Sequence, residues 1–184
     1  MKNFKEILIS SVTLMLIAAV VTAALAGTNA LTKDTIKKQT EEAETAARME
    51  VIEADSFVQG TVTLDGKEQV YYTAYADDAA VGYVFTTASV GKSAGLTVMT
   101  GISKSGTITG VKVTDDNETA GYVNKVEKAG FLSAFIAKPA KEMKIDTDVD
   151  AVSQATKTSS GICKAVNQAI AAYQAIKEGG ANGK

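Results

Sequence analysis

An uncharged apolar stretch near the N-terminus places the tightest limit on what this chain can fold into. The twenty residues from Ile7 to Ala26 carry no charge, and about 20 apolar residues are needed for a helix to cross the hydrocarbon core of a bilayer. We therefore predict a transmembrane helix over residues 7–26. The competing interpretation is a cleaved signal peptide, because Ala24-Leu25-Ala26 suits signal peptidase, but such peptides have apolar regions of only about 7–15 residues.

The residues before this stretch predict its orientation. Lys2 and Lys5 precede it, and positively charged flanks stay in the cytoplasm. We expect residues 1–6 to be cytoplasmic and the rest of the chain to lie on the outer side of the cell membrane, which makes a single-pass protein. A pilin-type leader is disfavoured because Phe4-Lys5-Glu6 lacks the glycine that should precede it.

The composition of the chain excludes several classes of function. There is no histidine and only one cysteine, so His-based zinc sites, Ser-His-Asp or Cys-His catalysis and internal disulfides are excluded. The net charge is −2, and no basic run is long enough to follow a phosphate backbone. We predict no catalytic residue, no metal site and no nucleic-acid partner.

Residues 27–54 form a charged segment that we predict to be a helical stalk. From Leu31 to Glu53 the chain is rich in Lys, Glu, Ala and Gln, has no Gly or Pro, and repeats apolar residues at rough helical spacing. Such a helix lifts a domain off the lipid without a specific binding role.

The pattern then changes from helical to β. Four runs of β-branched and aromatic residues are separated by turn residues such as Asp77-Asp78. The simplest arrangement is an antiparallel meander of four strands. The runs cover residues 69–75, 81–86, 96–102 and 107–113.

The chain after these strands has helical patterns, so we predict one α+β domain over residues 55–178, with an antiparallel sheet packed against helices. A short helix carries Phe131, Leu132 and Phe135, and it must end before Pro139.

A long amphipathic helix completes the domain. We expect Ser159 or Ser160 to cap its start and Gly179-Gly180 to end it, leaving a flexible tail over residues 179–184. Its apolar residues recur at helical spacing, at Ile162, Val166, Ala169, Ile170, Tyr173 and Ile176.

Two loops rich in small and polar residues are the candidate sites. The first, residues 115–122, follows the last predicted strand, and the second, residues 150–161, leads into the long helix. A helix N-terminus attracts anions, and the Ser and Thr hydroxyls with Lys157 add to an anion site. Composition alone leaves two plainer interpretations open, a surface turn for the first loop and helix capping for the second.

Residues 150–156, Asp-Ala-Val-Ser-Gln-Ala-Thr, resemble a known flavin-attachment motif. The motif is Asp-x-x-Ser/Thr-Gly-Ala-Thr, and it belongs to the FMN-binding domain shared by the G subunit of the Rnf electron-transport complex and the C subunit of the sodium-translocating NADH:quinone reductase. In that family a flavin transferase joins FMN to the last threonine through a phosphoester bond. The resemblance implies that Thr156 is this threonine, and the chain's size favours the Rnf member of the two.

The first loop resembles the same family. Glu118-Thr119-Ala120-Gly121-Tyr122 is similar to a Glu-Thr-Pro-Gly-Leu segment that lies beside the flavin. The span, the stalk, the strands and both loops also occur in the family's order. The resemblance implies covalent FMN at Thr156 and further flavin-binding residues at Ser153, Gln154, Ala155, Lys157, Thr158, Glu118, Thr119, Gly121 and Tyr122.

Three positions depart from the family's pattern. Gln154 replaces a glycine, which predicts a turn with less access to positive φ and a side chain that the transferase does not expect. Ala120 replaces proline and makes the first loop less rigid. Tyr122 replaces leucine, and its ring can stack on a flavin.

The resemblance implies an electron-transfer subunit of an Rnf-type complex, which couples ferredoxin oxidation and NAD reduction to ion movement. FMN would relay electrons on the outer face of the membrane, and the partners would be the other membrane subunits, the flavin transferase and the bilayer. The chain would have no independent catalysis. Two alternatives remain open: an FMN carrier, freed by cleavage after Ala26, that serves another extracytoplasmic chain, and a non-redox surface protein.

Two further features have structural interpretations. Cys163, near the start of the long helix, is predicted to be a structural cysteine and not a reactive one. Asp146, Asp148 and Asp150 alternate like the start of a calcium loop, but the glycine and distal glutamate of such a loop are missing. We expect these carboxylates to be solvated.

Overall fold

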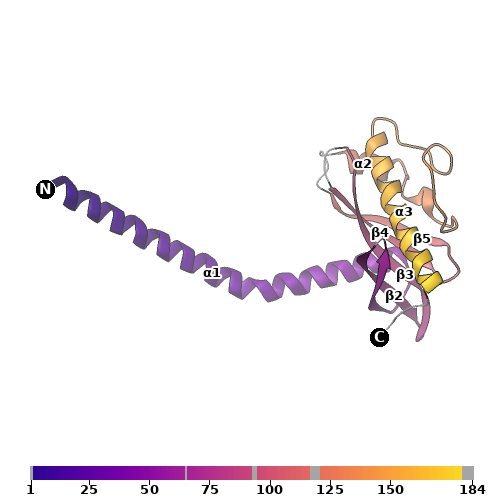
Figure 1. Cartoon of the computed structure of the whole chain (residues 1–184), viewed down its shortest axis with the longest axis horizontal. Helices are drawn as coiled ribbons and strands as arrows, with labels where there is room; N and C mark the ends of the chain where they lie inside the picture. The colour runs from indigo at the N-terminus through magenta and orange to yellow at the C-terminus, as the bar shows by residue number, and fades with distance from the viewer. Residues whose placement is uncertain (1, 65, 93–94, 117–120, 180–184) are drawn as a thin grey trace. The chain divides into compact units, whose positions relative to one another are not determined.

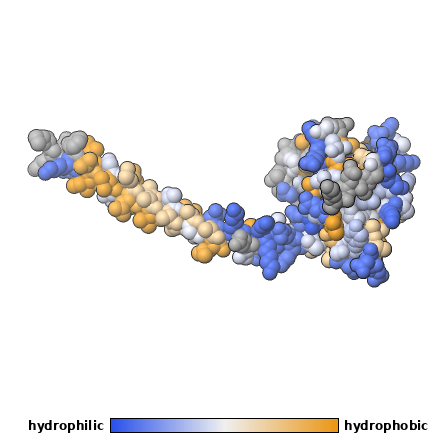
Figure 2. Space-filling view, turned by 60° about the horizontal axis from the view of Figure 1, so that its bottom comes forward, coloured by the Kyte–Doolittle hydropathy of each residue, from blue (hydrophilic) through white to orange (hydrophobic). Residues whose placement is uncertain are grey.

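The N-terminal region is one long helix. The computed structural model describes residues 2–64, 66–92, 95–116 and 121–179, and the chain divides into two compact units, Met1–Glu44 and Thr45–Lys184. Helix α1, Lys2–Val51, crosses that division. Among the described residues it is the one helix long and apolar enough to span a membrane, a test that a signal sequence also passes. Figure 2 shows an almost continuous hydrophobic surface along its N-terminal part.

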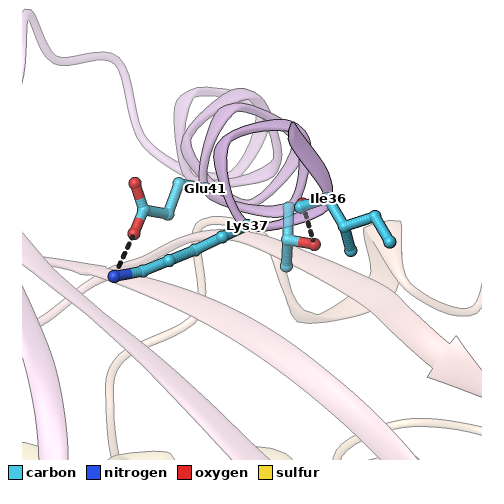
Figure 3. Close-up of polar contacts among 4 residues, drawn as sticks. Ile36, Lys37 and Glu41 are labelled. Atoms are coloured by element: carbon cyan, nitrogen blue, oxygen red, sulfur yellow. Dashed lines mark hydrogen bonds and ion pairs between the residues drawn. The ribbon is translucent and has the colours of Figure 1, made fainter. Parts of the chain in front are cut away.

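The middle of α1 is polar and is stabilised within the helix itself. Lys37 and Lys38 pair with Glu41 and Glu42, one turn further on, at 4.0 and 3.9 Å. Figure 3 shows the Lys37 pair beside Ile36, whose carbonyl accepts a hydrogen bond from the Thr40 hydroxyl at 2.9 Å. Exposed i,i+4 pairs each add only about 0.3–0.5 kcal/mol. The predicted stalk is therefore helical here.

The last turns of α1 are part of the second unit. Val51 is buried, and its carbonyl accepts a hydrogen bond from Thr109 Oγ1 at 2.6 Å. A Cβ on Gly101 would lie 2.3 Å from the same carbonyl oxygen, and a Cβ on Gly110 would lie 2.6 Å from the Val51 Cα. The two glycines thus let the helix backbone rest directly on the sheet. Arg48 adds its guanidinium over the Tyr72 ring, 3.7 Å from the centroid.

The second unit contains an antiparallel sheet of five strands in the order β1-β2-β3-β4-β5. The predicted meander and the α+β class are confirmed, but the prediction of four strands was wrong by one. The additional strand precedes the others, and Gly60 lies opposite Tyr71 within it. A Cβ at Gly60 would lie 2.6 Å from the Tyr71 ring, so this strand needs a glycine where strand patterns normally exclude one. The strands are β1 Ser56–Leu64, β2 Lys67–Ala76, β3 Ala79–Val90, β4 Gly95–Ser103 and β5 Ile108–Asp116.

Helix α3, Thr156–Gly179, packs along one face of this sheet (Figure 1). The main core lies between them, and aromatic side chains link the two layers, with the Tyr83 and Tyr173 rings 5.9 Å apart. Two buried hydroxyls of β3 also contact helix carbonyls: Thr87 donates to Ala165 at 2.9 Å and Ser89 donates to Gly161 at 2.6 Å. The amphipathic stripe predicted for this helix is confirmed, because all six of its residues are buried.

The segment between β5 and α3 differs from the prediction. Helix α2, Tyr122–Lys128, was not predicted, and the expected helix around Phe131 and Phe135 is a turn followed by one 3-10 turn, η1, Ser133–Phe135. The Phe131 and Phe135 rings pack edge to face, 5.2 Å apart. Gly121 is the N-cap of α2 and has a left-handed conformation (φ 89°). Pro139 follows η1 as expected.

Helix α3 also begins earlier than predicted. It starts at Thr156, so the prediction that Ser159 or Ser160 caps it was wrong, and both serines lie inside the helix. At the other end Gly179 is the last helical residue. The predicted tail from residue 180 onward lies outside the described residues.

Candidate functional site

A strained tight turn immediately precedes α3. Ala155 N–H donates to Val152 C=O at 2.9 Å, which closes a four-residue turn, and Gln154 at the third position has φ 65°. Positive φ at the third position alone is the pattern of a type II turn, which favours glycine there. The expectation that glutamine would keep this turn from positive φ was wrong: Gln154 adopts the left-handed conformation, which costs about 1–2 kcal/mol for a residue with a Cβ.

Ser159 holds this turn against the helix. Its side chain is fully buried, and its hydroxyl accepts a hydrogen bond from Val152 N–H at 3.2 Å and donates one to Ala155 C=O at 3.2 Å. Its own N–H also donates to Ala155 C=O at 2.9 Å. Ser159 therefore ties the start of the turn to the first turn of α3, and it fixes where Thr156 leaves the turn.

Acidic side chains stabilise the loop that leads to this turn. Asp148 accepts a hydrogen bond from Lys144 N–H at 2.9 Å, and Asp146 accepts one from Ala151 N–H at 3.3 Å. These carboxylates organise backbone that would otherwise lack partners, which is a common role of Asp in loops.

Thr156 and Lys157 are exposed and are the first two residues of α3. Helix geometry leaves the N–H groups of a first turn without intrahelical acceptors, and the helix dipole places partial positive charge there. The first turn of α3 contains no acidic residue. Both side chains lie on a cleft of about 220 Å³, which is lined by Lys92, Tyr122, Gln154, Ala155, Thr156, Lys157 and Thr158.

Tyr122 is an aromatic residue that lines the cleft. It is the first residue of α2, directly after Gly121. The Lys92 ammonium donates a hydrogen bond to the Tyr122 hydroxyl and lies 4.0 Å from the ring centroid. The Lys125 ammonium lies 5.4 Å from the same centroid and donates to Gln154 Oε1 at 3.3 Å. The tyrosine ring thus shares the cleft with the start of α3, and two ammonium groups lie beside the ring.

The charge and the aromatic lining of this cleft suit FMN. Every charged residue that lines it, among the described part of the chain, is a lysine. A phosphate oxygen would meet ammonium groups and a helix N-terminus, both of which stabilise an anion, and the exposed Thr156 hydroxyl is available for an ester. The Tyr122 ring offers an aromatic surface on which a flat ring can stack.

The structure brings most of the predicted site residues together. Gln154, Ala155, Thr156, Lys157 and Thr158 line the cleft with Tyr122. Ser153 is exposed in the turn, and Gly121 precedes Tyr122 without lining the cleft. Glu118 and Thr119 lie outside the described residues.

Two lysines of the site were not predicted. Lys92 comes from the connection between β3 and β4, and Lys125 comes from α2. Neither has a sequence signal, because isolated lysines on exposed loops and helices are common and only the tertiary fold places these two beside Tyr122. The contact between Lys125 and Gln154 exists only because glutamine replaces the motif's glycine.

Cys163 is close to the cleft in sequence but is buried. Its Sγ donates to Met143 C=O at 3.5 Å. Burial raises the pKa of the Cys163 thiol, and the negative charge of Asp148 raises it further. A thiol with a raised pKa is a poor nucleophile, which agrees with the structural role predicted for it.

The chain matches two known families. Residues 91–171 match the FMN-binding domain, and residues 1–51 match the RnfG N-terminal region. The first match contains the cleft with its turn, Lys92 and Tyr122. The fold and the site therefore define a class: proteins in which a helix capable of spanning a membrane precedes an FMN-binding domain.

Relatives identify the family within that class. The chain is 32% identical, over 97% of its length and all of the relative's, to the G subunit of the ion-translocating oxidoreductase complex of Methanosarcina acetivorans. It is 29% identical, over 90% of both chains, to the G subunit of the Na⁺-translocating ferredoxin:NAD⁺ oxidoreductase complex of Acetobacterium woodii. The chain belongs to the RnfG family.

A solved structure supports the fold. NqrC of Shewanella oneidensis superimposes with a TM-score of 0.53 over 72% of each chain, at 21% sequence identity. At that identity the likeness concerns the fold alone. It agrees with the α+β arrangement of a sheet covered by helices.

Proposed function

We propose that this chain is an electron-transfer subunit of a membrane-bound, ion-translocating ferredoxin:NAD oxidoreductase complex, and that it carries FMN on Thr156 through a phosphoester bond. One observation carries the proposal. The exposed hydroxyl of Thr156 lies at the first residue of α3, on a cleft whose charged lining residues are lysines. Membership of the RnfG family supports the same role.

The residues of the cleft divide the work of holding the cofactor. Lys157 and the first N–H groups of α3 neutralise the phosphate. Lys92 and Tyr122 provide the surface for the flavin ring, and Ser159 fixes the turn that presents Thr156. FMN supplies the redox chemistry, because a flavin accepts and donates electrons singly or in pairs. The protein supplies attachment, orientation and charge, and it needs no catalytic residue for that task.

The attachment is a phosphoryl transfer in which Thr156 is the acceptor. A flavin transferase would supply FMN activated as a phosphoanhydride, as in a flavin dinucleotide. The bond between Thr156 Oγ1 and the FMN phosphorus forms as the anhydride P–O bond breaks. The nucleotide leaves, and the hydroxyl proton passes to a base of the transferase. Because Thr156 is exposed, its hydroxyl can enter another protein's active site without unfolding.

We place the chain in the membrane by its N-terminal helix. Residues 7–26 would span the bilayer, residues 1–6 would be cytoplasmic, and the stalk would hold the FMN-binding domain on the extracytoplasmic side. A covalent link suits that side of the membrane, because a cofactor that dissociated there would be lost from the cell. The neighbouring membrane subunits of the complex would exchange electrons with the flavin.

Denaturing electrophoresis tests the attachment. The full chain is expressed with a flavin transferase, denatured, and viewed in the gel under ultraviolet light. We expect a fluorescent band that is lost in Thr156→Ala. Ser160→Ala is the matched control, because it removes an exposed hydroxyl one turn further along α3, and it should keep the band. A fluorescent Thr156→Ala band, or a dark band in every lane, would contradict the proposal.

A further inference from the structure

A second cleft lies beside Thr156 and is not explained by the flavin cleft. It has a volume of about 250 Å³ and shares only Thr156 and Lys157 with the first cleft. Its other lining residues come from the last residue of β3, the residue after it, and the first turns of α3. They are Val90, Gly91, Ser160, Gly161 and Lys164.

The charged residues that line this cleft, in the part of the chain that the structure describes, are two lysines, Lys157 and Lys164. Lys157 and Lys164 are seven residues apart on α3, which places them on one face of the helix, about 10.5 Å apart along its axis. Both are exposed, and Ser160 lies between them on the same face. No acidic residue lines the cleft among the described residues. Two lysines two turns apart on one helix face can pair with carboxylates on an acidic protein surface.

The cleft also has an apolar contact point on a rigid base. Val90 is 67% exposed although it is a large apolar residue. The backbone beneath it is fixed, since a Cβ on Gly161 would lie 2.9 Å from both the Gly91 Cα and the Val90 carbonyl oxygen. The Ser89 hydroxyl also donates to Gly161 C=O at 2.6 Å. The exposed valine gives this cleft an apolar contact point, and the lysines around it give the polar, solvent-accessible rim that protein interfaces have.

We infer that this surface, formed by Val90, Lys157, Ser160 and Lys164, is where an acidic face of a redox partner protein docks to exchange electrons with the flavin. The inference rests on the proposed function, because Thr156 on the edge of the surface would carry the cofactor. Contacts that serve electron transfer are small and rely on charge for orientation. The surface meets both conditions, and it leads directly to the attachment residue.

Charge reversal at Lys164 tests the inference. Lys164 lines the second cleft only, whereas Lys157 also lines the flavin cleft and is left unchanged. Membranes that contain the whole complex, with either wild-type chain or Lys164→Glu, are assayed for ferredoxin-dependent NAD⁺ reduction over a range of salt concentrations. The fluorescent flavin band is measured on the same membranes. Lys104→Glu is the control, because Lys104 is exposed and its carbonyl contacts Tyr173, far along α3 from Thr156.

We expect Lys164→Glu to keep the full flavin band and to lower the rate about tenfold at low salt, with Lys164→Gln in between. The difference should shrink as salt rises, because the screening length falls to about 3 Å at 1 M. Lys104→Glu should match the wild type at all salt concentrations.

Three results would overturn the inference. The first is an unchanged rate in Lys164→Glu at low salt. The second is a lost flavin band in that variant, which would mean that the surface serves flavin attachment. The third is a defect that disappears when the complex is reconstituted in vesicles of phosphatidylcholine alone, which would assign the lysines to anionic lipid. A dark wild-type band would instead reject the proposed function itself.

Discussion

The first turn of α3 and the remainder of the same helix contact very different surroundings. Thr156, Lys157 and Ser160 in the first turns are exposed, and they line clefts. From Ile162 to Ile176 the apolar stripe is buried against the sheet. One helix therefore has an exposed part, which is the face of Thr156, Lys157 and Ser160, and a buried part, which is the apolar stripe from Ile162 to Ile176.

The two parts of α3 are stabilised by different interactions. Apolar burial stabilises the buried part, and this stabilisation is strong because each buried side chain contributes about 1.5–3 kcal/mol. The exposed part depends on a few hydrogen bonds around Ser159. They hold the preceding turn in place although its residue Gln154 is strained. The two parts should therefore respond separately to substitution.

Truncation of a core residue should give the largest loss of stability. Ile170→Ala removes a side chain that is 2% exposed, and we expect the free energy of unfolding to fall by about 2–5 kcal/mol. Thr156→Ala, in the exposed first turn, should change it by no more than about 0.5 kcal/mol. Urea unfolding of the full chain in detergent measures both, read from the near-ultraviolet circular dichroism of tyrosine, since the chain has no Trp. Equal losses of stability in the two variants would contradict the difference between the buried and exposed parts of α3.

Gly161→Ala should have the next largest effect, because it adds a methyl group where two backbones touch. Its Cβ would lie 2.9 Å from Gly91 Cα, and relieving that overlap should cost about 1–3 kcal/mol. The same unfolding measurement applies, with Gly27→Ala as a control, since a Cβ there would meet nothing within 4 Å. A variant as stable as the wild type would show that the end of β3 yields more easily than the packing indicates.

Gln154→Gly should stabilise the chain by about 1 kcal/mol. The substitution removes the cost of a side chain at φ 65°, and the hydrogen bond to Lys125 that it loses is exposed and weak. Gln154→Ala is the matched control, because it removes the hydrogen bond but keeps the Cβ. Flavin attachment should be unchanged or improved in Gln154→Gly. A drop in attachment would show that the transferase reads the glutamine side chain.

The smallest expected effect concerns pH. Because burial raises the pKa of Cys163 in the folded chain, the unfolded chain releases this proton first as the pH rises. The thiol therefore has no effect on stability below its ordinary pKa, and it makes the folded state less stable as the pH rises above that value. Urea unfolding between about pH 8 and about pH 10 should show a steeper loss in the wild type than in Cys163→Ala. Parallel curves would contradict the assigned environment.

Periodicity predicted the structural part of the molecule well. The stripe from Ile162 to Ile176 repeats with the helical period. The strands around Val84 and Val98 were found from their β-branched and aromatic composition, because around these residues both faces of the strands are buried and burial does not alternate. Strand β1 was missed because Gly60 interrupts its pattern, and the reason for that glycine is a side chain eleven residues away, Tyr71. The sequence pattern within the strand gives no information about this contact between Gly60 and Tyr71.

The candidate site at the start of α3 was only partly predictable. The resemblance of residues 150–156 to a motif led to Thr156. The start of α3 was placed too late because a serine at position 159 is typical of a helix cap, whereas Ser159 is buried and its hydrogen bonds connect the turn to the helix. Lys92 and Lys125 join the site only through the fold.

Mass spectrometry of one peptide tests the central claim most directly. Cleavage after Lys144 and Lys157 releases residues 145–157, which contain three hydroxyls that could carry a phosphoester, on Thr147, Ser153 and Thr156. In a chain produced with a flavin transferase, we predict that this peptide is heavier by one FMN less one water, and that its fragments place the added mass on Thr156. An unmodified peptide, or added mass on Thr147 or Ser153, would contradict the account.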